Sequence, residues 1–542
     1  MPSTLHASLI ARLDRIGASA KEVAQIGAVL GREFPYELIQ PVARRGPADL
    51  QAALALLTEA GLLFCRGAPP HASYLFKHAL VQDAAYGTLL RTRRQELHAH
   101  VAAVLEQDFA DLVERQPELL AHHLTAAGDT ARAVNQWLNA GQYAAERSAH
   151  VEAISHFERG LAALSESPEG ATQDGRELEL QLARGLSLFT VKGYSSVQAI
   201  EAYTRAHELA EQTGDTRRLF VAVYGLWQSA AGSGKLLAGH RLSDRLLDLT
   251  AGTTDDGLRL QAHHSAWATY LHRGEPAAAR EHCEAGRGLY DPERHRLHRL
   301  LYGGHDPGVC AGIIGAQAYW LLGYPEKGLA IGKEALALAK RIAHPFSLQI
   351  ALLNAAILHL DRGEPELALQ LLATAEALVA EQRLAFIHEP RFLRGAALSA
   401  QGAFAEAVAC LREGLAGRLG MVRSRPYGLA RLAEALARQG QHGAALGAAR
   451  EWLQAQEETG EGQWDAELHR LEGIALLGLN QVDDSQNALE EALRIARDRQ
   501  AKAYELRAAT CLARLWGERG RRAEARADLR MVHRRLRYRR FE

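Results

Sequence analysis

The sequence predicts an all-α protein whose larger part is a solenoid of helical hairpins, preceded by a small domain with two short strands. In the second half, turn-forming residues recur about 40 residues apart. Residues at fixed distances before and after these turns are small. The first hundred residues lack this spacing and follow the order helix, strand, turn, strand, helix.

The recurring turns separate apolar helical stretches from about residue 257 onward. They fall at Gly274, Gly323, Gly363, Gly402, Gly440, Asn480 and Gly520. A period of this length is typical of stacked helix-turn-helix units, each of which cannot bury its apolar face alone. The first step is longer than the others, and we attribute the excess to an insertion or linker at Tyr290–Gly304.

Small residues hold a constant phase relative to the turns. Seven residues before the last six turns stand Ala316, Ala356, Gly395, Ala433, Gly473 and Ala513, and five residues after them stand Gly328, Ala368, Ala407, Ala445, Ser485 and Ala525. Two antiparallel helices approach closely only where neither carries a bulky side chain. The pattern resembles the tetratricopeptide repeat, although Trp452 stands where a small residue is expected and the usual proline after the second helix is absent.

The repeats predict the domain organisation of most of the chain. Apolar helical stretches also alternate with turns upstream, but with less regular spacing, as in 131–159 and 176–213. This pattern predicts irregular helical repeats over residues 115–290. Regular repeats follow over 305–530, and an Arg-rich basic tail occupies 531–542.

Residues 1–105 are predicted to form a winged-helix-like domain. Helices are expected around 9–16 and 21–30, then a helix at Pro47–Ala60, strands at 62–66 and 74–78, and a helix at 79–90. The helix in the DNA-recognition position has no Lys or Arg and carries Asp49 and Glu59, a face that repels phosphates. Nucleic acid is therefore an unfavoured partner. Arg44 and Arg45, just before this helix, are the basic residues that leave DNA binding as an alternative.

Five passages carry a closer resemblance: residues 5–15, 26–34, 76–86, 304–310 and 506–516. They are similar to bacterial signalling proteins that join a class III adenylate/guanylate cyclase domain, a STAND-type AAA ATPase and a tetratricopeptide tail. The resemblance covers the C-terminal part of those proteins, so their cyclase domain and phosphate-binding half would precede Met1. ATP or ADP would then be bound only with an upstream ATPase domain, and this chain would be a fragment, a split gene or a shortened paralogue.

His78 is the candidate cofactor-binding residue that the resemblance implies. In STAND ATPases a histidine of the winged helix can contact the bound diphosphate, and Phe76-Lys77-His78-Ala79-Leu80 resembles that motif. An imidazole is a suitable donor to phosphate. The competing interpretation is a histidine that is hydrogen-bonded at a strand end.

Other signatures are incomplete, so we expect no catalytic residue and no metal site. Gly232-Ser233-Gly234-Lys235 is followed by Leu236 instead of Ser or Thr and is predicted to be a turn between helices. After His388-Glu389, Phe392 stands where a zincin needs histidine. The spacing of His295, His298, His305 and Cys310 matches no common structural zinc pattern.

The amino-acid composition limits the expected partners and the cellular compartment. The net charge of -1 argues against a general attraction to nucleic acid or anionic membrane. Five dispersed cysteines and the lack of an N-terminal secretory pattern favour the cytoplasm. The uncharged stretch Pro307–Pro325 is interrupted by glycines and is predicted to be a buried helix, so no membrane partner is expected.

Three functions remain open at this stage. The leading hypothesis is a non-catalytic regulatory scaffold, in which the solenoid binds a protein partner or ligand and is coupled to an ATPase or cyclase module. The second is a fragment of a working cyclase or ATPase whose catalytic domains lie upstream. The third is the tail of a transcription regulator of the LuxR or maltose-activator type, for which only the Arg-rich end occupies the place of a DNA-binding domain.

Overall fold

The computed structural model describes residues 3–147, 149–166, 171–382, 389–416 and 425–537. The chain divides into two compact units, Met1–Ser187 and Leu188–Glu542. The division falls within a long helix, α11 (Ala171–Lys192). The first unit therefore contains helices between residues 115 and 187 in addition to the N-terminal domain.

The N-terminal part of the first unit combines helices with a small antiparallel sheet. Its elements are α1 (Ser3–Arg15), α2 (Ala18–Leu30), β1 (Glu33–Pro35), α3 (Tyr36–Ala43), α4 (Pro47–Glu59), β2 (Leu63–Arg66), β3 (Ser73–Phe76) and α5 (Ala79–Gly87). The strands pair in the order β1-β3-β2. The helix, strand, turn, strand, helix order predicted between residues 47 and 90 is present, and β1 is an additional strand.

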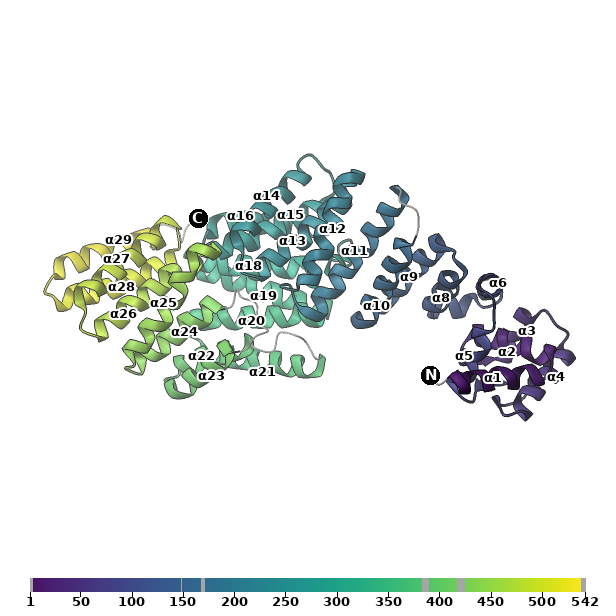
Figure 1. Ribbon diagram of the computed structural model, residues 1–542. Helices are drawn as coiled ribbons and strands as arrows, with labels where there is room; N and C mark the ends of the chain where they lie inside the picture. The colour runs from purple at the N-terminus through teal and green to yellow at the C-terminus, as the bar shows by residue number, and fades with distance from the viewer. Residues whose placement is uncertain (1–2, 148, 167–170, 383–388, 417–424, 538–542) are drawn as a thin grey trace. The chain divides into compact units, whose positions relative to one another are not determined.

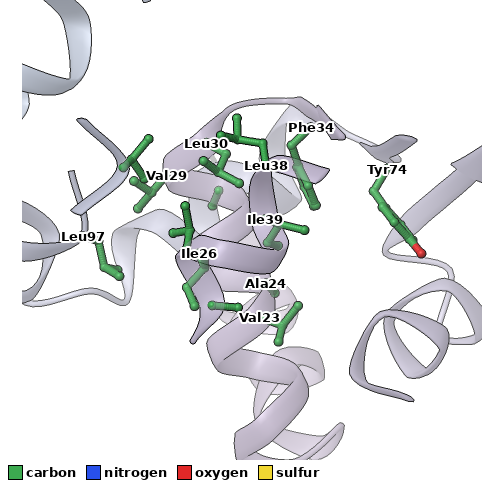
Figure 2. Close-up of a cluster of buried hydrophobic side chains, with 14 of the residues drawn as sticks. Val23, Ala24, Ile26, Val29, Leu30, Phe34, Leu38, Ile39, Tyr74 and Leu97 are labelled. Atoms are coloured by element: carbon green, nitrogen blue, oxygen red, sulfur yellow. The ribbon is translucent and has the colours of Figure 1, made fainter. Parts of the chain in front are cut away.

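An aromatic cluster joins the sheet to α2. Phe34 of β1 packs against Tyr74 and Phe76 of β3, with ring centroids 5.9 Å apart in both pairs. Figure 2 shows Phe34 and Tyr74 with the aliphatic side chains of α2 and α3. A Cβ atom at Gly27 would lie 2.6 Å from the Phe34 ring, so only glycine lets β1 approach α2 this closely.

The rest of the first unit is helical, with α6 (Arg91–Asp108), α7 (Ala110–Arg115), α8 (Pro117–Ala127), α9 (Thr130–Glu146) and α10 (His150–Ser165). Between α6 and α8 the buried rings of His98 and His123 contact each other, with 2.9 Å between their Nδ1 atoms. The Tyr86 hydroxyl lies 3.0 Å from Nε2 of His98. Burial lowers the pKa of His98 to about 4 and that of His123 to about 3, so both rings are neutral near pH 7.

The second unit is a stack of antiparallel helical hairpins that follows α12 (Val197–Thr213), as the sequence predicts (Figure 1). The paired helices are α13 (Thr216–Gly232) and α14 (Leu236–Thr250), α15 (Asp256–His272) and α16 (Pro276–Leu289), α18 (Pro307–Leu321) and α19 (Pro325–Ile342), α20 (Pro345–Asp361) and α21 (Pro365–Gln382), α22 (Glu389–Ala400) and α23 (Phe404–Ala416), α24 (Arg425–Arg438) and α25 (His442–Thr459), α26 (Asp465–Gly478) and α27 (Val482–Asp498), and α28 (Lys502–Glu518) and α29 (Arg522–Arg537). Residues 531–537 of the basic segment thus belong to the last helix.

The predicted turn residues lie in the hairpin turns. Each of the seven has a positive φ, from 59° at Asn480 to 90° at Gly323. Glycine and, less readily, asparagine adopt this left-handed conformation, which ends a helix while satisfying its last carbonyl groups. The predicted interruption between Tyr290 and Gly304 is also present and contains only the short helix α17 (His298–Leu301).

The small residues lie where the two helices of a hairpin cross. Ala356, Ala368, Ala433 and Ala445 are fully buried. At Gly473 an added Cβ would lie 2.7 Å from Leu489 of the partner helix, and the Ser485 hydroxyl donates to the Gly473 carbonyl at 2.7 Å. The phase read from the sequence therefore marks real close approaches of the helices. Trp452, the exception, is buried in α25.

The array of hairpins also closes upon itself, a feature that the spacing of the turns does not predict. The first helices of successive hairpins contact one another, and in addition α18 contacts α28. The amides of Gly462 and Gln463 donate to the carbonyl of His272 at 2.9 and 3.0 Å. The segment before α26 is thereby held against the turn between α15 and α16.

The apolar stretch near residue 310 forms α18, which is buried throughout except for Gln317. It lies in the middle of the hairpin stack and contacts α15, α16, α19 and α20. Among the described helices, none has both the length and the apolar character needed to cross a membrane.

Candidate ligand-binding cavity

The first helices of the hairpins enclose a cavity of about 210 Å³ within residues 188–542. Because α18 contacts α28, helices from the middle and the end of the array face the same space. The wall is mostly aromatic and aliphatic, with contributions from Tyr194, Trp227, Ile313, Ile314, Trp320, Phe346, Ile350, Leu353, Ile357, Phe392, Tyr427, Trp464 and Tyr504. Such a surface favours an apolar occupant.

Helical periodicity explains why α18 and α20 each supply several residues of the wall. On α20 the lining residues include Phe346, Ile350, Asn354, Ile357 and Asp361, which recur every three or four positions. This spacing puts them on one face of the helix. Phe346, Ile350, Asn354 and Ile357 are only partly buried, because this face borders the cavity.

Aromatic rings close the wall on the side of α24, α26 and α28. Trp320 meets Tyr504 edge to face at 5.8 Å between centroids, and Trp464 lies 5.0 Å from Tyr427 and 6.0 Å from Tyr504. The Arg431 guanidinium stands over the Tyr427 ring at 5.0 Å. Edge-to-face and cation–π contacts of this kind hold large side chains in fixed orientations.

A network of buried ion pairs adjoins these rings, and one of its members, Asp361, also lines the cavity. Arg431 donates to Asp361 at 2.6 Å and to Glu434 at 3.2 Å, while Arg470 and Arg507 pair with Glu467 at 2.7 and 2.8 Å. With Asp361, Glu434 and Glu467 against Arg431, Arg470 and Arg507, the formal charges balance. We therefore assign the network to positioning the aromatic wall and not to attracting a charged ligand.

The carboxyl groups of the network respond differently to their surroundings. Burial raises the pKa of Asp361, although Arg431 opposes the shift. Burial alone would also raise the pKa of Glu467, but the guanidinium groups of Arg470 and Arg507 lower it to about 2. Glu467 is therefore ionised near pH 7, and breaking its ion pairs would leave a buried charge.

At the other side of the cavity, histidines and a cysteine come together from α15 and from the start of α18. One ligand atom from each of His264, His305 and Cys310 lies within 4.8 Å of the other two, and all three residues line the cavity. His264 and Cys310 are buried, and His305 is partly buried. Imidazole and thiolate groups in this arrangement can hold a metal ion.

Two of the four metal-ligand candidates from the sequence therefore belong to this cluster, and two do not. His295 accepts a hydrogen bond from the Asp291 amide at 3.1 Å, and His298 accepts one from Gln261 at 2.8 Å. His264, the third member of the cluster, was missed because it comes from a different hairpin, 41 residues before His305. A lone histidine inside a helix gives no signal of such a partner. Between His305 and Cys310, Asp306 is the N-cap of α18, with Pro307 in its first turn.

The remaining candidate residues from the sequence lie outside the histidine and cysteine cluster. His78 is exposed at the N-cap of α5, directly after β3, and its carbonyl accepts from the Val81 amide at 2.9 Å. Its imidazole makes no side-chain cap hydrogen bond. Gly232–Lys235 forms the predicted turn between α13 and α14. His388 lies outside the described residues, and Phe392 is buried in α22.

Comparisons with known proteins give one clear relative in sequence. No protein-family model matches the chain. An uncharacterized protein of Rhizobium meliloti (strain 1021) is 27% identical over 518 residues, which cover 93% of this chain and 50% of the relative. The chain thus spans about half the length of the curated relative that it matches.

Solved structures with a similar arrangement are helical-repeat proteins. A Rap protein complexed with competence and sporulation factor has a TM-score of 0.42 at 13% identity and covers 75% of this chain and 98% of its own. A STAND protein with a tetratricopeptide repeat sensor from Pyrococcus horikoshii has a TM-score of 0.32 at 11% identity, with 98% and 64% covered. These scores are low, so the fold assignment rests on the hairpins themselves.

Proposed function

We propose that this chain is a non-catalytic sensor and scaffold, whose repeat array binds an apolar ligand or an apolar segment of a partner protein. The observation that carries the proposal is the cavity built from the first helices of the hairpins. Its walls are aromatic and aliphatic, its ion pairs are balanced, and it borders side chains that are only partly buried. An occupant would touch helices from several hairpins at once and thereby stabilise the closed array.

The matched variants Ile357→Arg and Leu367→Arg test this role. Ile357 of α20 lines the cavity, whereas Leu367 of α21 is 44% exposed on the second helix of the same hairpin. Each tagged variant is captured from cells that express it, and the bound molecules are identified by native and peptide mass spectrometry. A molecule retained by the parent and by Leu367→Arg but lost from Ile357→Arg supports the proposal, whereas equal retention by both variants contradicts it.

We further propose that the array acts in the cytoplasm on an ATPase or nucleotide cyclase module. The support is the resemblance of the quoted passages to such signalling proteins, together with a relative twice as long as the matched region. The order helix, strand, two helices and two strands in residues 18–76 is that of a winged helix, and such a domain would transmit the state of an ATPase. In this proposal the catalytic work belongs to the module and not to this chain.

His78 is the residue through which the coupling would act. Its exposed position at the start of α5 leaves the imidazole available to a diphosphate held by an ATPase domain. In a chimera that joins a STAND ATPase domain to residues 1–542, His78→Ala should weaken ADP binding by roughly 1.5 to 3 kcal/mol, about tenfold or more.

Calorimetry measures this ADP affinity, and His71→Ala provides the control. His71 is an exposed histidine of the same unit that pairs with Glu37 instead. ADP affinity that is unchanged in His78→Ala, or equally lowered in both variants, would show that His78 does not sense the nucleotide.

A further inference from the structure

The cluster of His264, His305 and Cys310 has hydrogen-bond partners that determine which ring atoms are available. Nδ1 of His305 lies 3.0 Å from the carbonyl oxygen of Gly303. A carbonyl oxygen only accepts, so Nδ1 must carry the proton. In the neutral ring Nε2 then keeps its lone pair, and this atom lies 3.2 Å from Nε2 of His264.

The environment of His264 leads to the same arrangement. Gln261 donates through its Nε2 to His298 at 2.8 Å, and its Oε1 lies 3.0 Å from Nδ1 of His264. The Tyr224 hydroxyl lies 3.0 Å from the same Nδ1 and can either accept from it or donate to it. An amide oxygen only accepts, so the tautomer that satisfies Gln261 carries its proton on Nδ1. In that tautomer the lone pairs of the two Nε2 atoms face each other across 3.2 Å, which is repulsive unless a cation or a shared proton lies between them.

Cys310 adds a third ligand beside the two nitrogens. Its Sγ accepts a hydrogen bond from Nε1 of Trp267 at 3.4 Å, a contact that favours a thiolate. Two imidazole nitrogens bound to one tetrahedral zinc ion at about 2.0 to 2.1 Å are separated by roughly 3.3 Å. The observed 3.2 Å between the Nε2 atoms matches this value, and one ligand atom of each of the three residues lies within 4.8 Å of the other two.

We propose that His264, His305 and Cys310 bind a transition-metal ion, with Zn²⁺ as the preferred ion and one coordination position open to the cavity. Imidazole and thiolate ligands suit zinc and copper, whereas Ca²⁺ and Mg²⁺ require oxygen ligands. Binding needs a closure of Sγ by up to about 1 Å, since a metal-bound nitrogen and sulfur lie roughly 3.6 Å apart. The thiol proton leaves to solvent when the metal binds.

The open coordination position would let the metal ion contact a molecule bound in the cavity. Zinc with three protein ligands keeps its fourth position for water or for a donor atom of a bound molecule. The hydrogen bonds from the two Nδ1 atoms are the contacts that orient metal-binding histidines in other proteins. The site does not depend on the proposed partner function, because the three ligands and their supports belong to the chain alone.

Cobalt provides the direct test on the full-length chain. Co²⁺ is titrated into chelator-treated protein, and its absorption spectrum is followed before and after an excess of Zn²⁺ is added. The expected result is one Co²⁺ per chain, with intense visible bands of tetrahedral cobalt and a thiolate-to-cobalt charge-transfer band. Zn²⁺ should remove both signals. A parent protein without saturable Co²⁺ binding at micromolar concentration would overturn the proposal and leave a shared proton between the rings.

Three variants assign the ligands. Cys310→Ala should lose the charge-transfer band, and His305→Gln should weaken Co²⁺ binding at least tenfold. Cys283→Ala, which removes another buried cysteine from α16, should retain the parent spectrum and affinity. Circular dichroism confirms that each variant is folded. If Cys310→Ala unfolds, the Co²⁺ affinity of His305→Gln tests the site instead, because His305 is only partly buried. A charge-transfer band that persists in folded Cys310→Ala, or unchanged affinity in His305→Gln, refutes the assignment.

Discussion

Replacing Gly328 by alanine should destabilise the hairpin formed by α18 and α19, although alanine favours helices. A Cβ atom at this position would lie 2.7 Å from the carbonyl oxygen of Ala316 and 3.4 Å from the amide nitrogen of Trp320. Both are backbone atoms, so no side-chain rotation relieves the contact and the two helices must move apart.

The magnitude follows from two opposing effects. Alanine in a helix interior is more favourable than glycine by about 1 kcal/mol, whereas overpacking typically costs about 1 to 3 kcal/mol. Because the contact is with backbone, the upper part of that range applies, and the expected net loss is about 1 to 2 kcal/mol. Gly447 of α25 is the matched control, because it is exposed and no atom lies within 4 Å of its added Cβ. Gly447→Ala should therefore stabilise its helix by up to about 1 kcal/mol.

Peptide-resolved hydrogen–deuterium exchange measures the effect of each substitution on its own hairpin. Gly328→Ala should accelerate exchange in α18 and α19, and Gly447→Ala should slow it in α25. Local measurement is needed because stacked repeats contact mainly their neighbours and can open separately. If Gly328→Ala slows exchange as Gly447→Ala does, the helices do not cross at the small residues and the repeat phase is wrong.

Two further predictions concern buried polar groups. In the unfolded chain His98 and His123 take up a proton near pH 6.5, whereas in the folded chain they do so only near pH 4 and pH 3. Their contribution to the free energy of unfolding is therefore fully present above pH 6.5 and decreases as the pH falls below that value. The expected loss at pH 5 is about 2 kcal/mol per ring, measured by pulse proteolysis in urea at both pH values; equal midpoints would contradict it. Arg431→Met should cost about 3 to 5 kcal/mol by leaving Asp361 buried without this partner, and adding Asp361→Asn should recover part of the loss. Strictly additive losses in chemical denaturation would show that the two side chains are not coupled.

The hairpins could be predicted from the sequence because their determinants are local. A left-handed turn residue and the small residue on each side of it lie within 13 positions, as in Gly473, Asn480 and Ser485. Each of these requirements is set by neighbouring backbone, so it leaves a mark at a fixed offset. The same holds for the turn at Gly232–Lys235, whose neighbours form helices on both sides.

Closure of the array could not be predicted in this way. It depends on the small rotation between successive hairpins, summed over the stack, and no single residue encodes that sum. The backbone bonds from Gly462 and Gln463 to His272 join positions about 190 residues apart and use main-chain atoms, which leave no side-chain pattern. The cavity could not be predicted for the same reason, since its wall combines residues of several first helices, including Tyr504 of α28.

The histidine cluster lies between these two cases. His305 and Cys310 are close in sequence, but their spacing alone resembles no familiar zinc motif. The third ligand comes from α15, and its position depends on how the first helices of neighbouring hairpins pack. A solenoid brings such residues together because each first helix presents one face to the enclosed space. Chemistry in this fold is therefore to be sought among single residues on successive first helices, where a short sequence motif would not reveal it.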